Sequence, residues 1–257
     1  KEDLATMMNQ HQISHQFFIV SKRNLTNSIL KNLLSFDSNL SISFDSTNAE
    51  EIEKGLNVCN NTKNAFINST SADSERLEKI TTLAKKYNSN MIALTMNKEI
   101  GIPKTADERL ALAFEIMETC DEKEILHDKI YFDPLILPIS VEQSQAQEAI
   151  NTIQMIKQSF EPEVKTTVGL SNISNGSPKE IRPLINRVFA VLLYGAGLDS
   201  AIIDACKKTD RHPKFDRDFP KGIKYYQIEQ LEEALEGTTL VIGGVSSFGV
   251  DWFSDYV

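Results

Sequence analysis

Four short apolar stretches of the chain each run directly into a polar residue that could bind a ligand. The residues are Asp45, Asn68, Asp133 and Asn172, two carboxylates and two carboxamides. Their acceptors and donors match a flat heterocycle that carries an amino group, ring N–H groups and a carbonyl, better than they match a phosphate. The same residue types also cap helices and form turns, so each position has an alternative local role.

The apolar stretches alternate with longer amphipathic segments. Short β-rich runs cover residues 17–21, 42–46, 65–70, 91–96, 130–135, 166–171, 200–205 and 240–246. Periodicity and capping residues predict helices over residues 26–34, 74–87, 106–120, 141–160 and 183–195. This alternation predicts parallel strands joined by right-handed crossovers, and eight strands are enough to close a barrel. We therefore predict the α/β class and a (β/α)8 TIM barrel.

An open, doubly wound sheet is the alternative architecture for the same pattern. Its usual dinucleotide fingerprint has no good match here. The nearest candidate, Gly195-Ala196-Gly197, follows a predicted helix instead of a strand and has Ser200 in place of the third glycine. In a barrel, the C-terminal ends of all strands meet at the face where active sites are built. A barrel would therefore place all four polar residues around one mouth.

Composition excludes several classes of protein. Of the 257 residues, 41% are hydrophobic and 25% are charged, which is typical of a globular domain with one large core. The net charge of −9 argues against binding nucleic acid or an anionic membrane through bulk charge. No apolar run approaches the roughly 20 residues of a spanning helix, and the first residues do not resemble a signal peptide. Three scattered cysteines favour a reducing compartment, so we expect a cytoplasmic protein.

No metal site is expected from the spacing of potential ligands. His11 and His15 are four residues apart and could share a helix face, but the sequence offers no third ligand nearby. The single cysteines are expected to behave as small buried hydrophobic residues.

Eight segments together carry a family resemblance. They read ISFDSTN at 42–48, INST at 67–70, LTM at 94–96, GIPK at 101–104, DPLILP at 133–138, GLSNIS at 169–174, RPLINR at 182–187 and GLDSAI at 197–202. In this order and spacing, residues 41–206 resemble the methyltetrahydrofolate:corrinoid iron–sulfur protein methyltransferases. They are more distantly similar to the pterin domain of methionine synthase and to dihydropteroate synthase. The resemblance implies a pterin-binding TIM barrel.

The resemblance also implies a reaction and a partner. In such enzymes the N5-methyl group of methyltetrahydrofolate passes to the Co(I) corrinoid, a cobalamin-type cofactor, of a corrinoid iron–sulfur protein or another corrinoid protein. This chemistry belongs to one-carbon metabolism and the acetyl-CoA pathway. The chain itself would hold no metal, because the partner supplies the cobalt. Asn172 matches the family's asparagine that donates a hydrogen bond to N5 as the methyl group leaves.

Six further positions are assigned by the resemblance. Three match residues that hydrogen-bond the pterin edge, namely Asp45, Asn68 and Asp133. Gly169 would let the backbone approach the ring, and Ser171 would support the loop that carries Asn172. Arg182 matches a position near the mouth, where it would meet the glutamate tail of the folate or stay solvated.

The two ends of the chain depart from the family pattern. We expect a single domain over residues 1–257, with a family-like core at 41–206, an atypical N-terminal segment and an atypical C-terminal segment at 207–257. The strands at 17–21 and 240–246 could replace the missing family strands and close the barrel. Otherwise the sheet would keep an open edge, which favours association.

Three functional hypotheses remain open from the sequence. The first is an active methyltransferase that uses Asn172. The second is a non-catalytic or degenerate pterin-binding barrel, which the atypical ends motivate. The third is an enzyme similar to dihydropteroate synthase, although the loops after Asn68 and Asn172 offer few basic residues for a diphosphate. A different methyl donor and formation of a homodimer are also left open.

Overall fold

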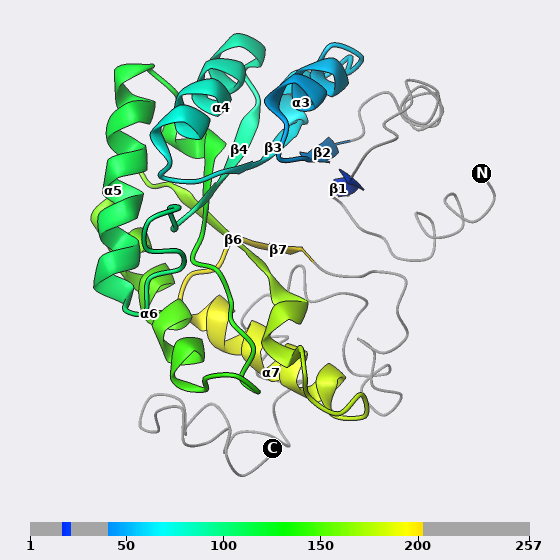
Figure 1. The fold of residues 1–257 in the computed structure, drawn as a ribbon, viewed down its shortest axis with the longest axis vertical. Coiled ribbons are helices and arrows are strands. Elements are labelled where there is room, and N and C mark those ends of the chain that lie inside the picture. Colours follow the sequence, from blue (N-terminus) through cyan, green and yellow to red (C-terminus); the bar gives the residue numbers. More distant parts are fainter. Residues whose placement is uncertain (1–16, 22–40, 203–257) are drawn as a thin grey trace, which may run out of the picture. The chain divides into compact units, whose positions relative to one another are not determined.

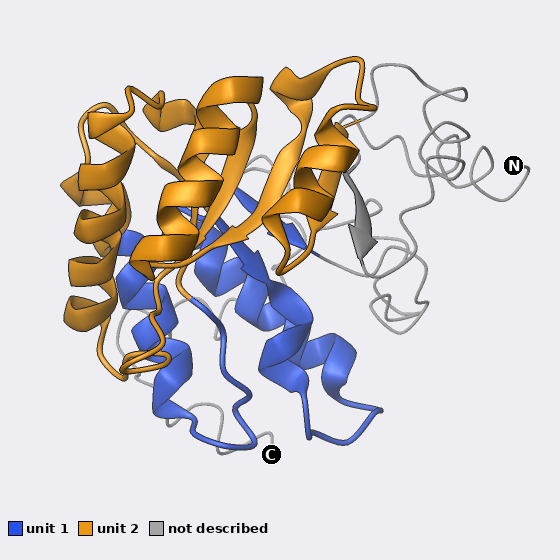
Figure 2. Cartoon of the chain, turned by 45° about the horizontal axis from the view of Figure 1, so that its top comes forward, with its two compact units in different colours: residues 1–12, 135–154, 167–257 blue, residues 13–134, 155–166 orange. Residues whose placement is uncertain are grey.

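The computed structural model describes residues 17–21 and 41–202 (Figure 1). The chain divides into two compact units, shown in different colours in Figure 2. Unit 1 consists of residues 1–12, 135–154 and 167–257, and unit 2 consists of residues 13–134 and 155–166. The predicted helix at 26–34, the predicted strand at 240–246 and the atypical segment at 207–257 lie outside the described residues.

Unit 2 contains a parallel sheet whose strands are neighbours in chain order. The strands are β1 (Phe17–Ser21), β2 (Ser41–Asp45), β3 (Phe66–Thr70), β4 (Asn90–Leu94) and β5 (Ile130–Asp133). Between them lie helices α3 (Ala49–Leu56), α4 (Ser74–Tyr87) and α5 (Ala106–Glu122), and the short 3-10 helices η1 (Thr62–Asn64) and η2 (His127–Lys129). The start of β6 (Lys165–Gly169) pairs in parallel with β5. Parallel neighbours in chain order are what repeated strand–helix crossovers predict.

Unit 1 contains the other end of the described chain. It holds most of helix α6 (Ser144–Ser159), the end of β6, the 3-10 helix η3 (Leu170–Ser174), helix α7 (Arg182–Gly195) and strand β7 (Ser200–Ile202). Strand β7 pairs in parallel with β6 from Thr167↔Ser200 to Gly169↔Ile202. The core of this unit joins fully buried side chains of α6, β6 and α7, among them Ile153, Val168 and Phe189.

The prediction of a complete eight-stranded barrel is not met. The described residues contain seven parallel strands, β1 to β7, and the eighth predicted strand lies outside them. The parallel crossover architecture is therefore confirmed. Closure into a (β/α)8 barrel is not present in residues 17–21 and 41–202.

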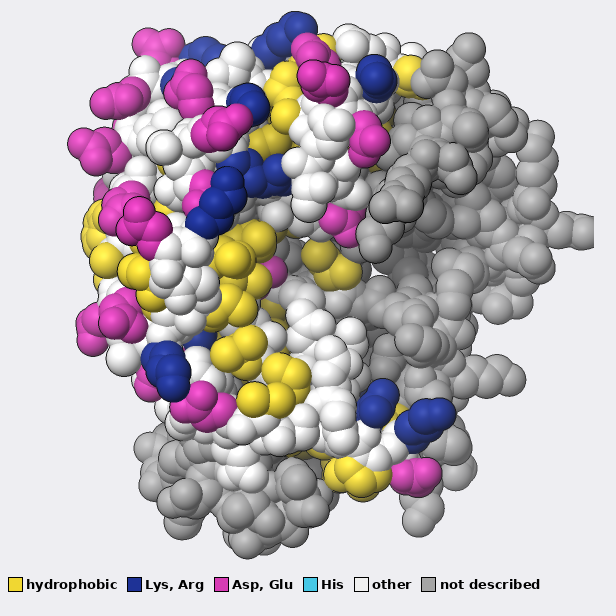
Figure 3. All heavy atoms as spheres, viewed as in Figure 1, with side chains coloured by type: hydrophobic (Ala, Val, Ile, Leu, Met, Phe, Trp, Pro, Cys, Tyr) yellow, Lys and Arg dark blue, Asp and Glu magenta, His cyan; other side chains and the backbone are white. Residues whose placement is uncertain are grey.

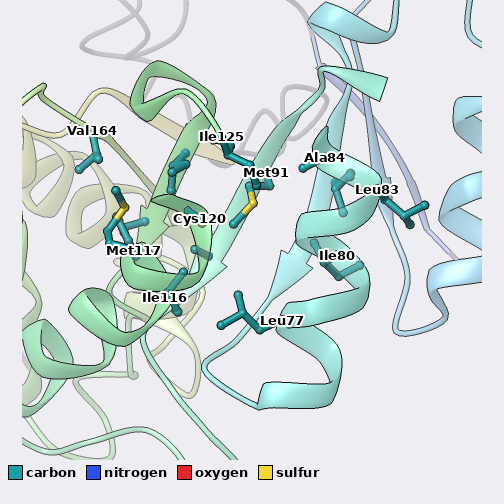
Figure 4. Close-up of a cluster of buried hydrophobic side chains, with 14 of the residues drawn as sticks. Leu77, Ile80, Leu83, Ala84, Met91, Ile116, Met117, Cys120, Ile125 and Val164 are labelled. Atoms are coloured by element: carbon teal, nitrogen blue, oxygen red, sulfur yellow. The ribbon is translucent and has the colours of Figure 1, made fainter. Parts of the chain in front are cut away.

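The helices cover one face of the sheet in unit 2. Side chains on this face form one hydrophobic cluster with α3, α4 and α5 and include Ile42, Phe44, Ile67, Met91 and Phe132. Figure 4 shows part of the cluster, where Met91 of β4 appears with Leu77 and Ile80 of α4 and Ile116 of α5. Because successive strand residues point to opposite faces, the residues between these apolar ones face away from the helices.

Capping interactions fix where the helices begin and end. Helix α5 begins at Ala106, as predicted, because Thr105 and Glu108 form a reciprocal capping box: the Thr105 hydroxyl accepts from the Glu108 N–H (3.3 Å) and the Glu108 carboxylate accepts from the Thr105 N–H (3.2 Å). Helix α4 ends as predicted at Tyr87, because Asn88 adopts a left-handed conformation with φ 50°.

Surface charges on unit 2 are largely mixed. Figure 3 shows Asp and Glu side chains interspersed with Lys and Arg. Helix α4 carries surface ion pairs, including Lys79–Glu75 at 2.7 Å and the pair of Glu78 with Lys123, the residue after α5, at 2.6 Å. Such surface pairs contribute little to stability. No helix among the described residues is both long and apolar enough to cross a membrane.

Gly55 marks a tight contact between α3 and the sheet. A Cβ atom at this position would lie 2.4 Å from Cε1 of Phe44, whose side chain is fully buried. We expect Gly55→Ala to lower the free energy of unfolding by about 1–3 kcal/mol, because overpacking against a fixed ring outweighs the gain of about 1 kcal/mol in helix propensity. Urea unfolding would measure this difference. Gly195→Ala is the matched control, because nothing lies within 4 Å of its Cβ position. Equal stabilities of the two variants would contradict the prediction.

His127 connects α5 to the loop before β6. Its Nδ1 lies 2.6 Å from the Pro162 carbonyl oxygen and its Nε2 lies 3.0 Å from Oδ1 of Asp121. Burial lowers the pKa of His127, but the two hydrogen bonds and the Asp121 charge outweigh it, so the pKa lies above its usual value. Both partners are acceptors, and only the imidazolium form donates from both nitrogens.

The raised pKa of His127 predicts how stability depends on pH. The stabilisation is fully present below the unfolded-state pKa of about 6.5 and is lost as the pH rises through the higher pKa of the folded state. We expect His127→Gln to destabilise the chain more at pH 6 than at pH 9 in urea unfolding. A stability difference that does not change between these pH values would show that the imidazolium has no role.

Candidate functional site

Asp45, the last residue of β2, lies beside Asn68, which is two residues before the end of β3. They are the last register pair between β2 and β3, and the Ser46 N–H donates to the Asn68 carbonyl oxygen at 3.1 Å. Residues paired directly across a sheet point to the same face. Ile42, Phe44 and Ile67 pack against the helices, so alternation places Asp45 and Asn68 on the opposite face.

Asp133 belongs to the same face. Asn68 pairs with Ile92, Leu94 pairs with Asp133, and Ile92 and Leu94 are two residues apart on β4. The neighbouring Phe132 packs against the helices, which confirms the alternation on β5. The sheet of unit 2 therefore brings all three residues predicted for the pterin edge to the face that points away from α3, α4 and α5, toward the carboxyl ends of β2, β3 and β5. Because none of these three helices covers it, we call this the helix-free face.

The immediate surroundings of these residues differ. Asp133 is 8% exposed, whereas Asp45 and Asn68 are partly exposed. The Asp133 carbonyl oxygen accepts from the Thr95 N–H at 3.1 Å and from the Thr95 hydroxyl at 3.3 Å, so the residue after β4 fixes the backbone at the end of β5. The register of β3 shifts between Asn68 and Thr70, and such bulges redirect side chains near functional sites.

The loops that follow the strands are joined by side-chain hydrogen bonds. Asp73 accepts from the Ser71 hydroxyl at 2.7 Å and from the Lys98 N–H at 2.8 Å, which connects the loop after β3 to the loop after β4. Burial raises the pKa of the Asp73 carboxyl, but these hydrogen bonds and the charges of Lys98 and Arg76 outweigh it and hold the pKa below its usual value. Asp73 is therefore an ionised acceptor at neutral pH.

In unit 1, Gly169, Ser171 and Asn172 lie at the end of β6 and in η3. Val168 packs in the core, so Gly169 is on the other face of the strand. A Cβ atom at Gly169 would lie 3.0 Å from Nδ2 of Asn172. The Asn172 amide therefore folds back over the end of β6, and glycine gives it room. This reason for a glycine was not visible in the sequence.

The Asn172 amide lies beside Asn175 and Gly169. The Asn175 Nδ2 lies 3.5 Å from Oδ1 of Asn172, a long contact at the limit of a hydrogen bond, and Nδ2 of Asn172 is the end that lies over Gly169. Asn172 and Ser171 are exposed, and the carbonyl oxygen of Ser171 accepts from the Ser174 hydroxyl at 3.2 Å. The donor end of Asn172 thus lies at a strand terminus and is accessible, as a donor to a bound ligand requires.

Arg182 starts helix α7 in unit 1. Its Nε donates to the carbonyl oxygen of Ser177 at 2.8 Å, so the side chain fixes the loop between η3 and α7. This contact gives Arg182 a local structural role, which the sequence did not indicate. Contact with a folate tail stays a prediction.

The potential metal ligands and the cysteines are only partly covered by the described residues. The described residues contain no group of three His, Cys, Asp or Glu side chains that could hold a metal ion. His11, His15 and Cys206 lie outside the described residues. Burial raises the pKa of Cys59 to about 11 and that of Cys120 to about 12, so neither is a thiolate nucleophile at neutral pH.

Residues 22–204 match the family described as pterin-binding enzymes. The match includes residues 22–40, which carry none of the motifs noted above. The chain is 29% identical over 233 residues to methionine synthase of Mycobacterium tuberculosis, covering 85% of the chain and 19% of that protein. It is 27% identical over 162 residues to methylcorrinoid:tetrahydrofolate methyltransferase of Eubacterium limosum, covering 62% of the chain and 58% of that protein. The chain thus spans less than two thirds of either relative.

Among solved structures, a dihydropteroate synthase from Coxiella burnetii, in complex with pteroic acid, superposes with a TM-score of 0.54. The two chains are 13% identical, and the superposition covers 93% of this chain and 83% of that one. At such low identity the likeness concerns the fold alone.

Proposed function

Because the chain belongs to the family of pterin-binding enzymes, we propose that it binds a reduced folate through the pterin ring and transfers a methyl group between N5 of that folate and a corrinoid. The observation that carries the proposal is the placement of Asp45, Asn68 and Asp133 on one helix-free face at the carboxyl ends of their strands. A position at the carboxyl ends of parallel strands is the usual location of a ligand site in this class of fold.

The three side chains match the hydrogen-bonding edge of a pterin. Two carboxylates can accept from the ring N–H and the exocyclic amino group, and a carboxamide can both donate to the ring carbonyl and accept from an N–H. Burial of Asp133 strengthens such a hydrogen bond, because water competes less for the carboxylate.

Asn172 is the proposed donor for the transfer step. As the methyl carbon leaves N5, the electron pair of the C–N bond stays on nitrogen, and a hydrogen bond from the Asn172 Nδ2 favours the charge that develops there. The corrinoid of a partner protein would supply the methyl acceptor. The relative from Eubacterium limosum is named for transfer from a methylcorrinoid to tetrahydrofolate. The same donor would serve both directions.

The proposal is tested by the thermal midpoint of the purified chain with and without methyltetrahydrofolate. A ligand that binds only the folded chain stabilises it by about 2.7 kcal/mol at 100 times its dissociation constant. The p-aminobenzoylglutamate portion alone, which lacks the pterin, is the control and is expected to give no shift. No shift with methyltetrahydrofolate in a cooperatively folded sample would refute the proposal. Binding without methyl transfer to a corrinoid protein would instead favour a non-catalytic pterin-binding barrel.

A further inference from the structure

Arg76 connects two strand ends through backbone carbonyl groups. It lies in the first turn of α4 and is partly buried. Its Nη1 donates to the Thr47 carbonyl oxygen at 2.6 Å, and its Nη2 donates to the carbonyl oxygens of Ser46, at 3.0 Å, and of Ser69. One side chain thus binds the loop after β2 and the end of β3 together.

The acceptors directly follow the residues proposed to bind the pterin. Ser46 is the next residue after Asp45, and Ser69 is the next residue after Asn68. Fixing the carbonyl group one residue further along restricts the backbone torsions that direct each ligand-facing side chain. The guanidinium group is planar and rigid, so it also fixes the separation of the two loops.

The three carbonyl oxygens that accept from Arg76 argue against a role in which Arg76 only holds helix α4 to the sheet. All three are backbone oxygens at the carboxyl ends of two neighbouring strands, and all belong to unit 2. Burial lowers the pKa of Arg76 while the charge of Asp73 opposes this change, and an arginine stays charged at neutral pH in either case.

We propose that Arg76 is a positioning residue that sets the spacing and orientation of Asp45 and Asn68 for the pterin edge. The proposal rests on the proposed function, since it assigns a role at the same site. Arg76 itself does not contact the ligand; it acts through the two loops.

The test compares three variants of the full chain. Arg76→Ala removes the guanidinium, and Arg76→Lys keeps the charge and much of the aliphatic stem but cannot bind three carbonyl groups in a fixed plane. Lys79→Ala is the matched control, because it removes one positive charge from the same helix and Lys79 is paired only with Glu75 among the described contacts. Two quantities are measured: the dissociation constant of methyltetrahydrofolate by calorimetry, and amide hydrogen exchange of residues 46–48 and 69–72 without ligand.

We expect both Arg76 variants to bind methyltetrahydrofolate roughly tenfold more weakly or worse, because small displacements of positioned groups have large effects. We also expect faster exchange in both loops. A tetrahydropterin without the glutamate tail should lose affinity by the same factor, since the defect is at the ring edge. Lys79→Ala should change none of these quantities. If Arg76→Ala does not fold, Arg76→Lys carries the test.

Wild-type affinity in a folded Arg76 variant would overturn the inference and leave the proposed function intact. Weaker binding with unchanged exchange in the two loops would also overturn it, because the effect would not pass through them. Absence of folate binding by the wild-type chain is a separate result, visible before any substitution, and would refute the proposed function together with this role for Arg76.

Discussion

Substitution of Asn172 by alanine is expected to slow methyl transfer by roughly 100-fold to 1000-fold, which is the usual effect of removing one donor that stabilises a developing charge. Binding of methyltetrahydrofolate should change little, because the proposed pterin-edge contacts come from Asp45, Asn68 and Asp133. The measurement is the single-turnover rate of methyl transfer with a corrinoid protein in the Co(I) state, together with the dissociation constant of the folate.

The placement of Asn172 gives a second, independent variant. Gly169→Ala would put a methyl group 3.0 Å from the Asn172 Nδ2, so the amide must move by a few tenths of an ångström. We expect a slower transfer step than in the wild type, but less slow than in Asn172→Ala. Gly195→Ala serves again as the control, because its Cβ position is open.

Two results would contradict the role of Asn172. A wild-type transfer rate in Asn172→Ala, with the folate still bound, would mean that stabilisation of the charge developing on N5 does not depend on this amide. A loss of folate affinity with an unchanged transfer rate at saturating folate would make Asn172 a binding residue instead, because an interaction equal in ground and transition states does not change the chemical step.

Local sequence signals predicted most of the regular elements. The predicted helix at 74–87 is α4 to the residue, because its capping residues and its apolar stripe are both encoded within the helix. Helix α5 was predicted to end at Cys120 and continues to Glu122, and α6 begins at Ser144 where residue 141 was predicted. Seven of the predicted strands coincide with β1 to β7, with differences only at their ends.

Helix α3 was missed because its stability depends on the rest of the fold. Its eight residues include three glutamates and a glycine, and only Ile52, Gly55 and Leu56 are buried. Gly55 would count against a helix on propensity alone. The structure shows that this glycine lets α3 pack closely on Phe44, a contact that no local pattern reveals.

Some features of the candidate site were also predictable from the sequence, and others were not. Alternation along β2, β3 and β5 follows from the sequence, so the common face of Asp45, Asn68 and Asp133 was predictable once the strands were placed in register. The role of Arg76 was not, because its acceptors are backbone oxygens, and any residue type can supply those. The contact between Gly169 and Asn172 also depends on how η3 folds back on β6.

Asp133→Asn is expected to weaken binding of methyltetrahydrofolate by about 10-fold to 150-fold, the equivalent of about 1.5–3 kcal/mol for a hydrogen bond to a charged group. The substitution keeps the size of the side chain but removes its charge and one acceptor. The backbone bonds from Thr95 to the Asp133 carbonyl oxygen do not involve the side chain, so the strand end should keep its structure.

Stability without ligand separates this binding defect from a folding defect. Asp133 is buried, so the unliganded thermal midpoint of Asp133→Asn is measured first. Each ligand-induced shift is then taken from the variant's own unliganded midpoint, which removes any change in stability that the substitution itself causes. Asp128→Asn, at the exposed 3-10 turn before β5, is the matched control and should change neither stability nor binding.

The stabilisation caused by bound folate then distinguishes the wild type from a variant that binds folate weakly. At a folate concentration of 100 times the wild-type dissociation constant, the wild type gains about 2.7 kcal/mol, whereas a variant with 100-fold weaker binding gains only about 0.4 kcal/mol. A full wild-type shift in Asp133→Asn would show that this carboxylate does not bind the pterin. Because Asp133 is the most buried of the three residues on the helix-free face, that result would also remove the strongest reason to place the pterin there.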